Sequence, residues 1–84
     1  MMTGRNVRVR RYSRAASKFI DHAGITVAWT FVGHGVWEVL VELVPTGEHI
    51  VVRHGDVKTI SMDARERLVK NYERREKASA RRDR

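Results

Sequence analysis

Basic side chains recur along the last quarter of the chain at intervals of three and four residues. The set, called here the basic stripe, consists of Arg67, Lys70, Arg74, Lys77, Arg81 and Arg84. Residues three or four apart lie on the same side of an α-helix, so a helix here would place these cations in one row about 25 Å long. Such a row suits the phosphates of a nucleic-acid backbone, which Lys and Arg neutralise. A solvated helix with a frayed basic tail is the alternative.

A second set of cations, with no acidic residue among them, lies near the N-terminus. Its members are Arg5, Arg8, Arg10, Arg11 and Arg14. Residues 1–12 are interpreted as a basic arm that orders on nucleic acid, or as a solubilising or targeting tail. Val7 and Val9 alternate with arginines, which is compatible with a short edge strand and equally with disorder at a terminus.

The overall charge points to an anionic partner. The 84 residues have a formal net charge of +7 and a pI of about 10.8, which favours nucleic acid, an acidic protein surface or an anionic membrane. Residues 21–60 hold five acidic side chains against two Lys or Arg. The predicted body is therefore mildly acidic, and the positive charge lies at both ends.

Length and composition exclude several classes of protein. The length predicts a single domain. The absence of cysteine excludes disulfides, thiol nucleophiles and cysteine metal sites. We find no apolar signal-peptide core and no run of about 20 apolar residues, and we expect a cytoplasmic protein that does not bind membranes.

Other candidate chemistry is weak. The four histidines lack the spacing of a metal site, so we predict no metal and no cofactor. Gly33-His34-Gly35 is not a phosphate-binding loop. Glu38 and Glu42 share one face of a strand, but a domain this small is not expected to form a catalytic pocket around them. We therefore predict a binding protein and no enzyme.

A short N-terminal helix is predicted from Ser13 to about His22. Ser13 is a suitable N-cap, and Gly24 is a suitable stop in the left-handed conformation. The apolar side of this helix would comprise Ala15, Ala16, Phe19 and Ile20.

Alternating residues between 25 and 54 predict three antiparallel strands joined by turns at 33–35 and 45–47, with a short fourth strand at 57–60. One apolar face would contain both tryptophans. Its members would be Ile25, Val27, Trp29, Phe31, Trp37, Val39, Val41 and Leu43. We expect the aromatic rings to be core, and base stacking is the alternative. The opposite face mixes Leu40 and Val51 with acids, which indicates cover by the N-terminal helix or a homodimer.

Ser61 is a suitable N-cap for a second helix, which is predicted from Met62 to about Ala80. Its packed stripe would comprise Met62, Leu68, Val69 and Tyr72. Beyond Tyr72 the helix should project into solvent. It would be supported by three ion pairs at i,i+4, namely Asp63–Arg67, Glu66–Lys70 and Glu73–Lys77.

Together these elements predict an α+β fold. A three- to four-stranded antiparallel meander would pack against a long C-terminal helix, with a short N-terminal helix. The predicted organisation is an arm at 1–12, a domain at 13–73 and a basic extension at 74–84.

The predicted order of elements resembles two families. Helix, three strands and helix resembles a double-stranded-RNA-binding domain. Three strands and a helix, with Gly35-Val36-Trp37 opening the second strand, is similar to AP2 and integrase arm-binding domains. Residues 61–64 lack the lysine-rich helix start of the first family, and Glu38, Glu42 and Glu48 replace the basic sheet of the second. No functional residue is therefore carried over from either family.

The resulting expectation is a small protein that binds DNA or RNA through arginine contacts to phosphates, such as a bacterial or phage regulator. The alternative is a non-enzymatic interaction module or inhibitor that docks on an acidic protein surface, using apolar residues such as Leu40 and Val51.

Overall fold

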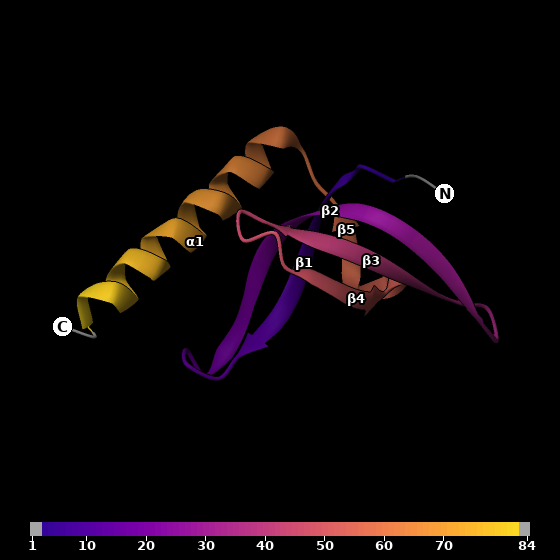
Figure 1. The fold of residues 1–84 in the computed structure, drawn as a ribbon, viewed down its shortest axis with the longest axis horizontal. Helices are drawn as coiled ribbons and strands as arrows, with labels where there is room; N and C mark the ends of the chain where they lie inside the picture. The colour runs from indigo at the N-terminus through magenta and orange to yellow at the C-terminus, as the bar shows by residue number, and fades with distance from the viewer. Residues whose placement is uncertain (1–2, 83–84) are drawn as a thin grey trace.

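The computed structural model describes residues 3–82 (Figure 1). The strands are β1 (Asn6–Ser13), β2 (Lys18–Gly33), β3 (Val36–Val44), β4 (His49–Arg53) and β5 (Val57–Thr59); a 3-10 turn η1 (His54–Asp56) precedes β5, and the helix α1 (Met62–Arg82) follows it. All strands pair antiparallel in the order β4-β3-β2-β1-β5. The α+β class and the long C-terminal helix are confirmed. The predicted count of three to four strands is wrong, because the sheet has five.

The predicted N-terminal helix is also wrong. Residues 18–22 belong to β2, which pairs with β1 over eight residues from Ser13↔Lys18 to Asn6↔Ile25. A tight turn joins the two strands, in which the Ser13 hydroxyl accepts a hydrogen bond from the Ala16 amide at 3.3 Å and Ser17 takes a positive φ of 52°. Val7 and Val9 are buried in the core. The burial of Val7 and Val9 stabilises the pairing of β1 with β2, and this outweighs the helical tendency indicated by the spacing of apolar residues at 15–20.

Gly24 is not a helix stop. It lies in β2 with β1 on one side and β3 on the other, opposite Val7 and Leu43, and its φ is not positive. A Cβ here would collide with the Cγ1 of Val41. The absence of a side chain therefore allows the buried Val41 to pack directly on the backbone of β2.

An irregularity in β2 changes which residues face the core. The pairing with β3 slips between Thr26 and Ala28, as in a β-bulge, which adds one residue to one strand. Thr26 is consequently buried, whereas Val27 is exposed and Trp29 is half-buried. The predicted apolar face is therefore wrong at this point. The extra residue means that Ile25 and Val27 do not share the core-facing side of β2 with Trp29.

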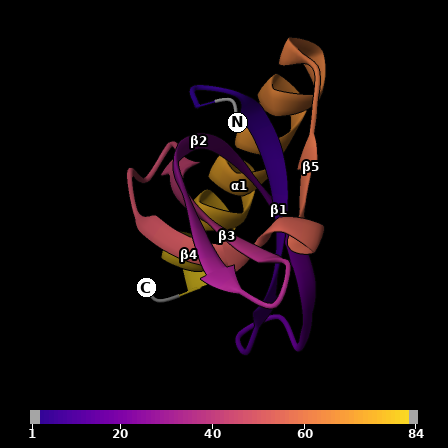
Figure 2. The ribbon, with the colours of Figure 1, turned by 90° about the vertical axis from the view of Figure 1, so that its right-hand side faces the viewer.

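The sheet curls so that β5 lies beside β1 while β4 lies on the opposite side of the molecule (Figure 2). The core inside this curl contains Val7, Val9, Val39, Val41 and Leu43. Trp29, Ile50, Val52 and Val57 pack around it. Residues 6–12, which the sequence suggested as an arm, thus form most of an interior strand that contributes to the core.

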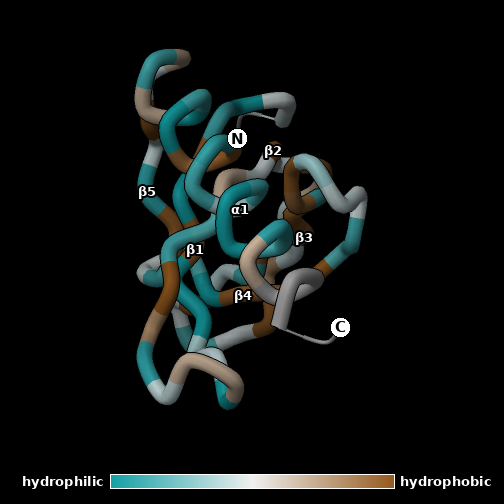
Figure 3. Tube along the Cα trace, turned by 90° about the vertical axis from the view of Figure 1, so that its left-hand side faces the viewer, coloured by the Kyte–Doolittle hydropathy of each residue, from teal (hydrophilic) through white to brown (hydrophobic). Residues whose placement is uncertain are grey.

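Helix α1 packs against β1 and β2 (Figures 1 and 3). The Ser61 hydroxyl accepts a hydrogen bond from the Ala64 amide at 3.2 Å, which confirms the predicted N-cap. Leu68, Val69 and Tyr72 are half-buried, whereas Met62 is exposed. No N-terminal helix covers the side of β3 and β4 on which Leu40 and Val51 lie, and Val51 there is 60% exposed.

Candidate nucleic-acid interface

The described side chains of the basic stripe are those of Arg67, Lys70, Arg74 and Lys77, and all four are exposed. On α1 they lie away from its half-buried residues, and much of the helix is coloured as hydrophilic in Figure 3. The backbone of Arg81 is helical, its side chain lies outside what the structure describes, and Arg84 lies outside the described residues altogether.

The described cations of the stripe are not part of any ion pair. Among the residues that the structure describes, none of its four cations has an ion-pair partner within 4.0 Å. The ion pairs predicted at i,i+4 along α1 do not form. Because exposed pairs of this kind contribute only about 0.2–0.5 kcal/mol, their absence has little effect on the helix and leaves the cations available to a ligand.

The N-terminal arginines are distributed differently. Arg8 and Arg10 point to the outer face of β1, where their guanidinium groups lie 4.0 and 3.0 Å from the carboxylate of Asp21 on β2. The hydrogen bond from Arg10 lowers the pKa of Asp21 below its usual value. Arg11 points to the other face and lies 3.2 Å from Glu48. Arg14 is exposed in the turn between β1 and β2.

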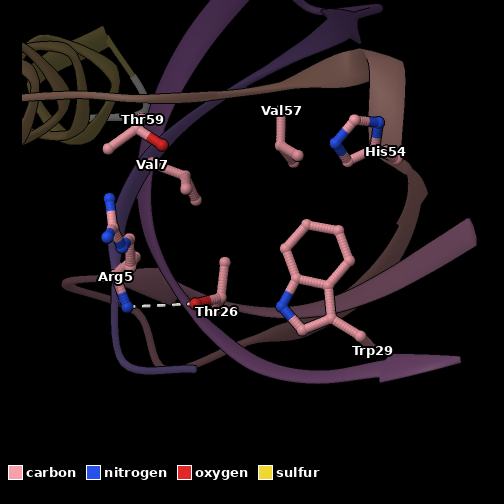
Figure 4. Close-up of a pocket in the computed structure, with 7 residues that line it drawn as sticks. All are labelled: Arg5, Val7, Thr26, Trp29, His54, Val57 and Thr59. Carbon is pink, nitrogen blue, oxygen red and sulfur yellow. Dashed lines mark hydrogen bonds between the residues drawn. The ribbon is translucent and has the colours of Figure 1, made fainter. Parts of the chain in front are cut away.

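Arg5 lines a hollow of about 310 Å³ at the open end of the curled sheet (Figure 4). Its backbone amide donates a hydrogen bond to the buried Thr26 hydroxyl at 3.0 Å. The lining also comprises Val7, Trp29, His54, Val57 and Thr59. The Trp29 and His54 rings approach to 5.6 Å between centroids. The lining is mainly apolar and contains no carboxylate, so it provides no pair of carboxylates for acid–base chemistry.

The outer surface of β1, β2 and β5 combines the predicted Arg8 and Arg10 with three candidates that the sequence analysis did not name, Tyr12, Phe19 and Lys58. We call it the β1 face and define it by Tyr12, Phe19, Arg8, Arg10 and Lys58. The register places Tyr12 opposite Phe19 and Arg8 opposite Lys58. A shallow hollow of about 250 Å³ is lined by Arg8, Arg10, Phe19, Gly55, Asp56 and Lys58. The alternation of Arg8, Arg10 and Tyr12 was visible in the sequence, but their cross-strand partners required the register.

A groove separates the β1–β2 turn from the second half of α1. Its lining includes Ala15, Ala16, Ile20, His22, Tyr72, Arg75 and Glu76. The His22 and Tyr72 rings are 6.1 Å apart between centroids. Burial lowers the pKa of His22, and the charges of Arg11 and Arg75 lower it further. Burial also raises the pKa of Tyr72, with a smaller contribution from Glu76. The turn that contains Arg14 therefore lies next to α1, on the other side of this groove.

Two further features concern other types of site. Among the residues described, no three His, Asp or Glu side chains are grouped so that they would hold a metal ion. Across residues 3–82, no helix combines the length and apolar character needed to cross a membrane.

Comparison with protein-family models, with curated proteins and with solved structures finds no match for this chain. We therefore infer the candidate interface from the geometry and charge of this chain's own residues.

Proposed function

We propose that this protein binds nucleic acid by contacts to the phosphate backbone, with the exposed face of α1 as the principal contact. The observation that supports this proposal is the row of four exposed cations, Arg67, Lys70, Arg74 and Lys77, with no acidic partner among the described residues. From the first to the last, the row spans about 15 Å of helix axis at about 1.5 Å per residue. This length matches several successive phosphates.

The number of cations determines the expected salt dependence. Each neutralised phosphate contributes about 0.9 to the slope of log affinity against log salt for duplex DNA and about 0.7 for single strands. Four contacts would therefore give a slope of about −3.6 for a duplex. The corresponding loss between 50 and 200 mM salt is about 150-fold.

The N-terminal arginines have a smaller role in this proposal than the sequence suggested. Arg8, Arg10 and Arg11 each have a carboxylate within 4.0 Å, and a phosphate would have to compete with that carboxylate. Arg14 is exposed in the turn next to the groove that borders α1, and we propose it as a secondary contact.

The proposal is tested by fluorescence anisotropy with labelled duplex DNA, duplex RNA and single strands over a salt series. We expect Arg74→Gln to weaken binding and to reduce the slope by about 0.9 on a duplex. Arg53→Gln is the matched control, because Arg53 is an exposed arginine on the edge strand β4 and outside the stripe. Equal losses in the two variants would show that only net charge matters, and no binding near physiological salt would refute the proposal.

A second candidate function is docking on a protein through the outer face of β2, β3 and β4. Val51 is largely exposed and lies directly opposite Leu40 on β3, so apolar surface is available there. Binding through this face would survive moderate salt and would be lost in Val51→Lys but not in Arg74→Gln. The same face would serve a homodimer, and a monomer mass by light scattering at high micromolar concentration would exclude one.

A further inference from the structure

We infer that the β1 face is a stacking platform for unpaired bases, so that the preferred ligand is single-stranded nucleic acid. This inference rests on the proposed function and names the ligand class within it. The helix stripe contributes phosphate contacts that any nucleic acid can satisfy, whereas the β1 face contributes contacts that only an unstacked base can make.

Two aromatic rings on this face are exposed. Tyr12 is 58% exposed and Phe19 is 65% exposed. The rings meet edge to face, with centroids 5.3 Å apart and planes inclined by 70°. In this arrangement the edge of one ring packs against the face of the other, and the remaining aromatic surface is exposed to solvent. An exposed ring held in place by a neighbour is preorganised for stacking, and stacking of a base on such a ring contributes about 1–3 kcal/mol.

Cations lie next to the exposed ring. Phe19 lines the shallow hollow of the β1 face together with Arg8, Arg10 and Lys58. Aromatic rings beside a basic groove are the combination that binds single strands, because the ring stacks on a base while the cations contact the flanking phosphates. The double helix keeps its bases stacked inside, so a duplex can use the cations of this face but not the rings.

The acidic residues of the β1 face reduce its positive charge and also fix the positions of its arginines. Asp21 contacts both Arg8 and Arg10, which holds the two guanidinium groups on the outer side of β1. Arg10 nevertheless remains 60% exposed, so part of its guanidinium is free to meet a phosphate. Asp56 lines the same hollow and opposes an anion there, which makes stacking the more important contribution of this surface.

The β1 face and the groove beside α1 lie on opposite sides of the β1–β2 hairpin, because Ile20 and His22 alternate with Phe19 along β2. The turn between β1 and β2 borders the groove formed with the second half of α1. Tyr12 and Phe19 lie at the turn end of their strands, where Ser13 pairs with Lys18. The two rings therefore lie at the end of the hairpin whose turn borders α1 across the groove.

The other hairpin of the sheet provides a matched control. Phe31 on β2 is 54% exposed and contacts Trp37 on β3 with ring centroids 5.2 Å apart. It is therefore an exposed aromatic residue in a similar cross-strand pair. Residues 19–44 of the β2–β3 hairpin contain no Lys or Arg, and the pair next to Phe31↔Trp37 contains Glu38.

The experiment compares Phe19→Ala, Phe31→Ala and the conservative variant Phe19→Trp. The ligands are a labelled oligothymidylate of about 12 nucleotides, an abasic strand with the same number of phosphates, and a duplex of the same length. We expect Phe19→Ala to bind oligothymidylate about 5- to 150-fold more weakly, the equivalent of about 1–3 kcal/mol. Its affinities for the abasic strand and the duplex should remain at the wild-type level. Phe31→Ala should bind like the wild type, and Phe19→Trp should retain the preference for bases.

The outcomes separate this inference from the proposed function. If the wild type binds all three ligands through Arg74 but Phe19→Ala and Phe31→Ala behave alike, the stacking platform is refuted and the proposed function stands. If the wild type binds no nucleic acid, both fail. Thermal unfolding followed by circular dichroism verifies that each variant is folded. If Phe19→Ala unfolds, Tyr12→Ala is measured in its place, and the same loss with oligothymidylate is required.

Discussion

Replacing Gly24 by alanine tests the central packing of this fold. In the structure, a Cβ at this position would collide with Cγ1 of Val41, and it would lie 3.3 Å from the carbonyl oxygen of Glu42. Val41 is fully buried, so its side chain has no free space into which it can move. Overpacking of this kind costs about 1–3 kcal/mol, and the reduced freedom of the unfolded chain offsets about 0.4–1 kcal/mol of that cost.

The net expectation for Gly24→Ala is a destabilisation of about 1–2 kcal/mol. A domain of this size is stable by only about 4–12 kcal/mol, and each kcal/mol shifts the unfolding temperature by about 4–8 °C. Calorimetry should therefore show a decrease of about 4–16 °C. Gly55→Ala is the control, since Gly55 lacks a positive φ and a Cβ there would meet nothing within 4 Å; it should remain within about 0.5 kcal/mol of the wild type.

A double-mutant cycle tests the reasoning further. Val41→Ala removes the methyl group that a Cβ at Gly24 would strike, so the two substitutions together should destabilise less than the sum of their separate effects. A coupling of about 0.5–3 kcal/mol is typical of residues in contact. Additive effects within about 0.5 kcal/mol, or an unchanged unfolding temperature in Gly24→Ala, would refute the interpretation that Val41 packs directly on the backbone at Gly24.

Two pH-dependent effects follow from the ion pairs and buried groups. The pKa of His22 is lowered from 6.5 by burial and by Arg11, so its contribution to stability is complete above pH 6.5 and decreases as the pH falls towards the folded-state pKa. His22→Gln should remove this part of the decrease in unfolding temperature measured between about pH 7.5 and pH 5, and an unchanged profile would contradict the role of burial. The pKa of Asp21 is lowered from 3.8, first by the hydrogen bond from Arg10, so its contribution is present above pH 3.8 and is lost as the pH falls below that value. Asp21→Asn should slightly lower the unfolding temperature near neutral pH and have no effect at about pH 2; an equal effect at both values would show that charge is not responsible.

The C-terminal half of the fold was predictable because its signals are local. Ser61 caps the helix, the half-buried Leu68, Val69 and Tyr72 recur with helical period, and the stripe lies opposite them. Each of these properties depends on residues within a few positions along one helix. The turns at 33–35 and 45–47 were equally local, and they lie where the structure changes strand direction.

The N-terminal half was not predictable because its structure depends on distant residues. The segment from Ala15 to Ile20 has helical spacing, but β1 is paired on one side with β2 and on the other with β5, which lies nearly fifty residues along the chain. The bulge at Val27 likewise has no local sequence signal, yet it decides that Thr26 is buried. The β1 face was missed for the same reason, because Lys58 reaches Arg8 only through the pairing of β1 with β5.

The fold also changes how the charge of the chain should be interpreted. The sequence places comparable numbers of cations at both ends, but strand pairing brings Asp21 and Glu48 to the N-terminal arginines, whereas the stripe meets no acid among the described residues. Exposed ion pairs contribute little to stability, so these pairs matter more for the electrostatic potential than for the fold. They concentrate the available positive charge on α1. A ligand attracted by net charge alone would therefore be oriented towards the helix, and the rings of Tyr12 and Phe19 beside the adjoining turn would then distinguish an unpaired strand from a duplex.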